Sequence, residues 1–121
     1  MTEGLRKKEF PMKIKDLAEK YSMKILNPAD IETREGHGCY CGDLLSWVMS
    51  RANADDIWLT VMGNVNSVGV AVLADVACIV LTENAAFDQD AMKRAEENNV
   101  IVLQTEMNTY ETATKIYEEL K

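Results

Sequence analysis

The stretch IWLTVMGNVNSVGVAVLADVACIVLTEN, residues 57–84, alternates strand-like with helix-like patterns and decides the fold class. An apolar run of β-branched and aromatic residues at 57–61 stops at a polar cluster, a helix-like segment follows at 68–76, and another apolar run occupies 78–81. The same kind of alternation returns over residues 88–103. Strands that alternate with helices predict a mainly parallel sheet covered on both faces. We therefore expect a three-layer α/β/α fold.

Weaker patterns on either side complete the predicted order of elements. Apolar residues at helical spacing begin at Ile14 and return after Gly42, and Asn108 with Glu111 has the spacing of a capping box. The cluster Glu35-Gly36-His37-Gly38 is expected to be a connection, because glycine interrupts both patterns. The remaining predicted elements are helices at 14–21, 44–53 and 88–97, a last helix that buries Tyr110, Ala113, Tyr117 and Leu120, and strands at 22–26, 31–34 (an edge strand) and 100–103.

Composition favours one small globular domain and excludes several classes of partner. The chain has 121 residues, 47% of them hydrophobic, which suits one core. Its formal charge of −7 opposes binding to nucleic acid or to anionic membranes, since both require a dense basic surface. No signal peptide opens the chain and no apolar stretch is long enough to span a bilayer, so a cytoplasmic protein is expected. Residues 1–11 are interpreted as a flexible leader or added segment, and residues 12–121 as a single domain.

Polar clusters follow three of the predicted strands, and ligands of parallel sheets bind outside the carboxyl ends of the strands. The first cluster, around Gly63, places backbone amides at the start of a helix, where a phosphate or a carboxylate would fit. An ordinary turn that uses its asparagines for capping is the alternative. The candidate ligand-binding residues are Gly63, Asn64, Asn66, Ser67, Thr82, Glu83, Asn84, Thr105 and Glu106.

The cysteines are three in number and favour reduced thiols over a disulfide framework. Cys39 and Cys41 are too close in sequence for an ordinary disulfide, and Cys78 is expected to be a small buried hydrophobe. His37, Cys39 and Cys41 are metal-ligand types, but the chain offers no good fourth ligand for a tetrahedral site. No metal is therefore expected. A site at these three residues, or one pooled from two chains, is the alternative, and Asp43 is expected to cap the helix that follows.

The predicted helix at 68–76 is apolar on nearly every side, with Ser67 as its expected N-cap. A domain of this size has little protein to cover such a helix completely, so part of it is expected to meet a second copy of the chain. We therefore predict a homodimer. Trp47 and Trp58 are expected to pack in the core or at an interface.

Two strings resemble the DRTGG domain family, a small α/β module similar to the N-terminal domain of HPr kinase/phosphorylase. Cys41-Gly42-Asp43-Leu44-Leu45-Ser46-Trp47-Val48-Met49 is similar to the family's Gly-Asp-Leu-Leu-Ser-x-Val-Met segment. Residues 59–84 resemble its core, which runs from a Gly-Asp-Arg-Thr loop to Thr-Gly-Gly. The motif is degenerate, since Gly63-Asn64-Val65-Asn66 lacks the arginine and Thr82-Glu83-Asn84 lacks the glycines.

The resemblance implies regulation or scaffolding. Members of the family occur beside nucleotide-sensing and acyl-phosphate-metabolising domains, and stand-alone copies are linked with iron-hydrogenase genes. The sequence has no Gly-x-x-x-x-Gly-Lys-Ser/Thr loop, so kinase activity is not expected. We expect a non-catalytic module that needs no cofactor and senses a small anionic ligand such as a nucleotide. The alternative is a protein–protein adaptor or an accessory subunit for a metalloenzyme such as an iron hydrogenase.

Overall fold

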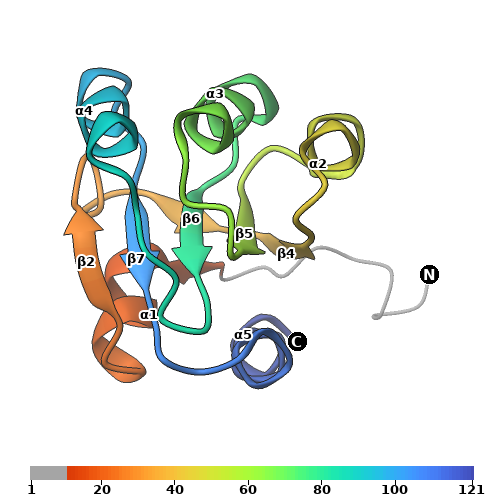
Figure 1. Cartoon of the computed structure of the whole chain (residues 1–121). Coiled ribbons are helices and arrows are strands. Elements are labelled where there is room, and N and C mark those ends of the chain that lie inside the picture. Colours follow the sequence, from red (N-terminus) through yellow and green to blue (C-terminus); the bar gives the residue numbers. More distant parts are fainter. Residues whose placement is uncertain (1–10) are drawn as a thin grey trace.

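The computed structural model describes residues 11–121 and has three layers, with one five-stranded sheet between two layers of helices (Figure 1). The strand order is β2-β7-β6-β5-β4; the last four strands are mutually parallel, and β2 runs antiparallel to β7. The three-layer, mainly parallel prediction is confirmed. The strands of this sheet are β2 (Lys24–Asn27), β7 (Val102–Gln104), β6 (Cys78–Leu81), β5 (Asp56–Thr60) and β4 (Gly38–Cys41).

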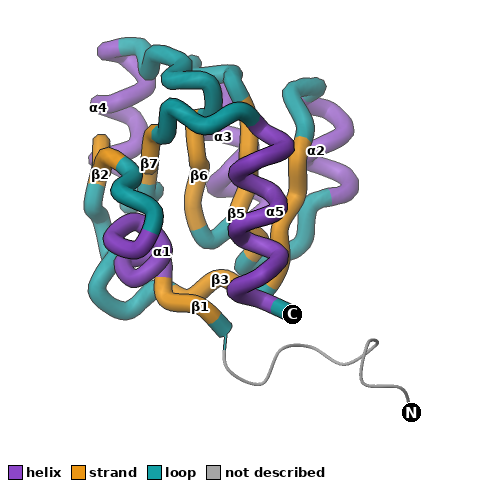
Figure 2. The backbone as a smooth tube through the Cα atoms, turned by 90° about the horizontal axis from the view of Figure 1, so that it is seen from below, coloured by secondary structure: helices purple, strands orange, loops and turns teal. Residues whose placement is uncertain are grey.

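Within residues 11–121, five helices cover the two faces of the sheet (Figures 1 and 2). On one face lie α2 (Leu45–Arg51), α3 (Val65–Ala74) and α4 (Gln89–Glu97). On the other face lie α1 (Ile14–Lys20) and α5 (Thr109–Leu120). A separate two-stranded ribbon pairs β1 (Met12–Lys13) with β3 (Glu35–Gly36).

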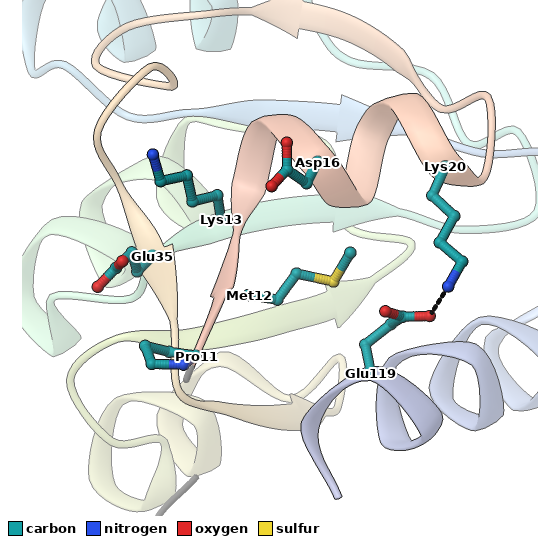
Figure 3. A pocket seen from close by; sticks show the side chains of 7 residues that line it. All are labelled: Pro11, Met12, Lys13, Asp16, Lys20, Glu35 and Glu119. Carbon is teal, nitrogen blue, oxygen red and sulfur yellow. Dashed lines mark hydrogen bonds and ion pairs between the residues drawn. The ribbon is translucent and has the colours of Figure 1, made fainter. Parts of the chain in front are cut away.

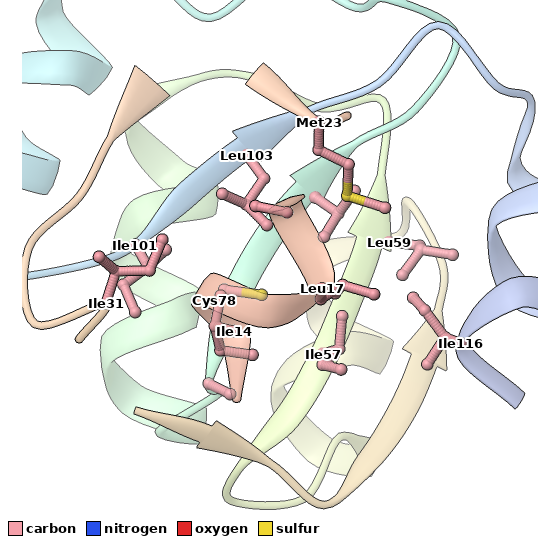
Figure 4. Close-up of a cluster of buried hydrophobic side chains, with 13 residues drawn as sticks. Ile14, Leu17, Met23, Ile31, Ile57, Leu59, Cys78, Ile101, Leu103 and Ile116 are labelled. Carbon is pink, nitrogen blue, oxygen red and sulfur yellow. The ribbon is translucent and has the colours of Figure 1, made fainter. Parts of the chain in front are cut away.

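The sheet carries a buried apolar cluster on each face. On the α1 and α5 side, Leu17 and Ile116 pack against Ile57 and Leu59 of β5 (Figure 4). On the other side, Trp58 lies fully buried among residues of α2, α3 and α4. Every residue of β5 is buried, because a central parallel strand is covered on both faces.

The helix starts were predicted with mixed success. The capping box is confirmed: Asn108 Oδ1 accepts from Glu111 N at 2.8 Å, and Glu111 reaches back to the Asn108 amide. The prediction that Ser67 caps the next helix was wrong, since α3 begins at Val65 and Asn64 is its N-cap. Asp43 does not cap α2 either, because its carboxylate accepts from the Thr60 hydroxyl and from the backbone amide of Val61.

The region before α2 differs most from the prediction. Residues 31–34 do not form an edge strand: residues 31–33 form turns, and the amides of Thr33 and Arg34 both bond back to the carbonyl of Asp30. The strands come later, in the cluster predicted to be a connection. A Cβ at Gly36 would overlap the side chain of Ile57, so this glycine reflects a close approach between strands and not a break in them.

The last helix confirms half of its predicted stripe, since Ala113 and Leu120 pack against the core and the two tyrosines do not. Tyr110 and Tyr117 are 79% and 66% exposed, whereas Thr112 and Ile116 are fully buried. The hydrophobic pattern did not predict the burial of Thr112, because threonine is counted as a polar residue. Its hydroxyl can be buried because it donates to the carbonyl of Asn108 in the preceding turn. Trp47 is also half exposed, while Trp58 is in the core as predicted.

Within residues 11–121, no helix is long and apolar enough to cross a bilayer. The predicted leader lies outside the described residues except for Pro11.

Candidate functional site

The carboxyl ends of the parallel strands β5, β6 and β7 lie at the same end of the sheet, and the three predicted polar clusters follow them. The β5–α3 loop holds Gly63, and the β6–α4 loop holds Thr82, Glu83 and Asn84. Thr105 and Glu106 belong to the β7–α5 loop. The parallel topology therefore brings all three clusters to the same end of the molecule.

At the β5–α3 loop most polar groups already have partners within the chain. Asn64 Oδ1 accepts from Ser67 N at 3.0 Å, and the buried Ser67 hydroxyl donates to the carbonyl of Met62 at 2.5 Å. A Cβ at Gly63 would overlap the carbonyl oxygen of Ala86, so the next loop packs directly on this glycine. Asn66 alone among the predicted residues here is exposed. This loop matches the alternative prediction of a capped turn.

The β6–α4 loop is fastened to the β7–α5 loop. The amides of Glu83 and Asn84 donate to the carbonyls of Met107 and Thr105 at 2.9 and 2.8 Å. The Thr82 hydroxyl is buried and lies 2.8 Å from that of Thr109. Both Glu83 and Asn84 adopt left-handed backbone conformations, with φ of 59° and 54°. Non-glycine residues take this conformation at a steric cost, so the backbone of this loop is strained at two successive residues.

An open cleft of about 380 Å³ lies beside the end of β7 and is called the β7 cleft below. It collects three of the predicted residues, Asn84, Thr105 and Glu106, from two different loops. The antiparallel pairing of β2 adds a cation, because Lys24 stands opposite Gln104 in the register. The complete lining is Tyr21, Ser22, Lys24, Asn84, Gln104, Thr105, Glu106 and Met107.

The polar side chains of the β7 cleft divide into fixed and available groups. Gln104 Nε2 donates to the carbonyl of Ala85 at 2.8 Å, which fixes this amide. Within the described part of the chain, the side chains of Ser22, Lys24, Asn84 and Glu106 have no hydrogen-bond or ion-pair partner. These groups offer an ammonium, a hydroxyl, an amide and a carboxylate to a ligand, a chemistry that suits non-covalent binding.

Tyr21 forms one wall of the β7 cleft and keeps its phenolic proton. Its hydroxyl donates to Glu119 Oε2 at 2.6 Å. That hydrogen bond, with burial as the next cause, raises the pKa of Tyr21 to about 12. The ring therefore adds no negative charge beside Lys24 near neutral pH.

Sequence reasoning missed Tyr21, Ser22 and Lys24. Tyr21 and Ser22 come from the α1–β2 connection and Lys24 begins β2, all distant in sequence from the three polar clusters. No local pattern shows that β2 pairs antiparallel with β7. Gln104 opens the predicted polar cluster that contains Thr105 and Glu106, although it was not predicted to bind a ligand, and Met107 directly follows that cluster.

A second pocket of about 490 Å³ lies between α1, the β1–β3 ribbon and the end of α5 (Figure 3). It contains two lysines and three carboxylates, and Lys20 is already paired with Glu119 at 2.6 Å. This pocket is therefore less suited to an anion than the β7 cleft. Its lining residues are Pro11, Met12, Lys13, Asp16, Lys20, Glu35 and Glu119.

Cys39 and Cys41 lie on β4, which is one edge strand of the sheet. The β7 cleft lies beside β2, which is the other edge strand. Cys39 and Cys41 are both exposed, and hydrogen bonding from Cys39 lowers the pKa of Cys41 to about 7. The same interaction raises the pKa of Cys39. Among residues 11–121, no group of three or more histidines, cysteines or carboxylates is arranged to hold a metal, so His37 does not join the two thiols in such a group.

Comparison with known proteins identifies a family and a solved structure of similar fold. The DRTGG domain matches residues 16–118. No curated protein sequence shows significant similarity to the chain. The chain is similar to the crystal structure of the CBS and DRTGG domains of the regulatory region of Clostridium perfringens pyrophosphatase, complexed with its activator, diadenosine tetraphosphate. The TM-score is 0.71 at 12% identity, over 90% of this chain and 47% of that one. The likeness is therefore one of fold, and the chain spans about half of that structure's length.

Proposed function

Because the chain belongs to the DRTGG domain family, we propose that it is a non-catalytic regulatory module that binds a nucleotide-like anion in the β7 cleft. The observation that carries the proposal is the meeting of Asn84, Thr105 and Glu106, from two loops, with Lys24 in one cleft at the carboxyl ends of the strands. The similar pyrophosphatase regulatory region, which is complexed with a nucleotide activator, supports the class of ligand.

The size and chemistry of the β7 cleft suit a small ligand. Its volume of about 380 Å³ falls within the range of small-molecule sites, about 300–1,000 Å³. Lys24 supplies the positive charge for a phosphate, and the amide of Asn84 supplies a donor. The β5–α3 loop has a smaller part in this proposal, because the Asn64 and Ser67 side chains already serve α3.

Thermal unfolding with ATP, AMP and diadenosine tetraphosphate tests the proposal. A ligand at about 100 times its Kd stabilises the native state by about 2.7 kcal/mol, which raises the Tm of a domain of this size by at least about 5 °C. We expect such a rise for at least one nucleotide and its loss in Lys24→Ala. Lys13→Ala, in the second pocket, is the matched control and should keep the full rise. Unchanged melting with all three nucleotides would contradict the proposal.

A second candidate function, protein docking, is favoured by the apolar side chains that α2 and α3 expose. Leu73 is 71% exposed, Trp47 is 51% exposed, and Leu44, Met49 and Val72 are also exposed. A surface of this kind fits a second copy of the chain or an adaptor role. We expect a dimer by light scattering, with Leu73→Asp monomeric and Tyr117→Asp, on the other face, still dimeric. A monomeric wild-type chain would contradict the dimer.

A further inference from the structure

Cys39 and Cys41 project from the same side of β4, because alternate residues of a strand face the same way. In the parallel register they stand beside Ile57 and Leu59, whose side chains face α1 and α5. Tyr40, between them, stands beside Trp58 and packs on the opposite face. Among residues 11–121, β4 pairs only with β5 and ends the sheet, and both thiols are exposed.

The spacing of the two thiols suits a bridging ion better than a disulfide. Residues two apart in a strand have Cα atoms about 6.6 Å apart, with nearly parallel side chains. A disulfide needs Cβ atoms about 3.5–4.5 Å apart, and β4 would have to bend to provide that. Two metal–thiolate bonds of about 2.3 Å each span about 4.6 Å between sulfurs. Side chains at alternate positions of β4 project in the same direction, so an ion between the two sulfurs requires no bend in the strand.

We propose that Cys39 and Cys41 form a two-thiolate site for one soft monovalent metal ion of the Cu(I) class. Thiolates select soft ions over hard ones. The number of available ligands favours an ion that two ligands can hold. Residues 11–121 contain no group of three or more histidines, cysteines or carboxylates that could hold a metal. A zinc ion would lack two of its four usual ligands. On binding, the two thiols lose two protons to solvent and the ion gains two metal–sulfur bonds.

Titration with Cu(I) under anaerobic, reducing conditions tests the site, with a chromophoric Cu(I) chelator as the competitor. The wild-type chain should withdraw one Cu(I) per chain from the chelator. Native mass spectrometry should show the gain of one copper and the loss of two protons. Cys39→Ser and Cys41→Ser should each weaken binding by more than about 100-fold, the upper end of the effect of losing an outer-shell partner.

Cys78→Ala is the matched control, because Cys78 is a free thiol buried in β6 and away from the edge. Its copper binding should equal that of the wild-type chain, with circular dichroism confirming that each variant is folded. The proposal is overturned if the wild-type chain withdraws no copper, or if both serine variants retain it. A ratio of one copper per two chains also overturns it, because that ratio requires a site shared between copies.

Discussion

The β5–α3 loop and the β7 cleft both lie at the carboxyl ends of the parallel strands. The polar side chains of the loop bond within the chain, whereas several of those in the cleft have no partner in the described chain. In the loop, Asn64 and Ser67 are committed to α3, and Gly63 lies under the next loop. In the cleft, Lys24 and Asn84 have no partner within the described chain. Topology thus determines where polar residues gather, whereas local hydrogen bonding determines which of them remain available to a ligand.

Gly63→Ala is expected to have the largest effect on the free energy of unfolding. The methyl group of Gly63→Ala would overlap the carbonyl oxygen of Ala86, and the backbone of both loops would have to shift. We expect a loss of about 2–3 kcal/mol in the free energy of unfolding, measured with urea. Gly69→Ala is the matched control: its Cβ has no atom within 4 Å, so this helical position should gain up to about 1 kcal/mol. Equal effects would show that the two loops are not tightly packed.

Asn64→Ala separates capping from ligand binding. Removing the Asn64 side chain leaves the Ser67 amide with only the backbone carbonyl of Asn64 as acceptor, at 3.1 Å, and we expect a loss of about 1 kcal/mol. The rise in Tm caused by a nucleotide should remain, because the cap lies outside the β7 cleft. Asn66→Ala, an exposed neighbour in the first turn of α3, should leave the stability nearly unchanged. If Asn64→Ala abolished the rise in Tm caused by a nucleotide, the β5–α3 loop would have to be part of the binding site.

Glu83→Gly should stabilise the chain. Glu83 has a φ of 59°, and glycine takes this conformation without the steric cost that a side chain imposes. We expect a gain of about 1 kcal/mol in urea unfolding. Asn84→Gly should gain less, because asparagine tolerates the left-handed region better. A loss of stability in Glu83→Gly would mean that the glutamate side chain makes a favourable interaction that outweighs the strain.

Lys24→Ala should have the smallest effect on stability, within about 0.5 kcal/mol, because the exposed ammonium makes no ion pair. The free energy of unfolding in urea measures this effect. The same variant should lose nucleotide binding, so it sharpens the contrast with Asn64→Ala, which loses stability and keeps binding. A large loss of stability in Lys24→Ala would mean that the β7 cleft is a structural feature.

The sequence predicted most of the fold because its strongest patterns lie where packing is simplest. β5 and β6 are buried on both faces, and they read as continuous apolar runs. β4 escaped notice because its glycines serve close packing: a Cβ at Gly38 would collide with the carboxylate of Asp56. Period and propensity carry no information about a neighbouring strand, so such glycines are easily mistaken for breaks.

The candidate site was predicted in part, for a related reason. Chain order along parallel strands places Asn84, Thr105 and Glu106 at one edge, and the structure brings these three into one cleft. The fourth component, Lys24, depends on the pairing of β2 with β7, which is a long-range property. The predicted role of the Gly63 loop stays a prediction, since a capped turn and an anion site share the same local signature.

The placement of β2 at the far side of β7 also bears on how the chain folds. Asn27 bonds to the carbonyl of Val100, 73 positions away, and Tyr21 bonds to Glu119, 98 positions away. Contacts of such high sequence separation slow folding, because loop-closure entropy is lost before they form. During synthesis, α1 and β2 would wait with their apolar faces uncovered until β7 and α5 had left the ribosome. An early stop in translation would therefore leave an aggregation-prone fragment and not a smaller folded unit.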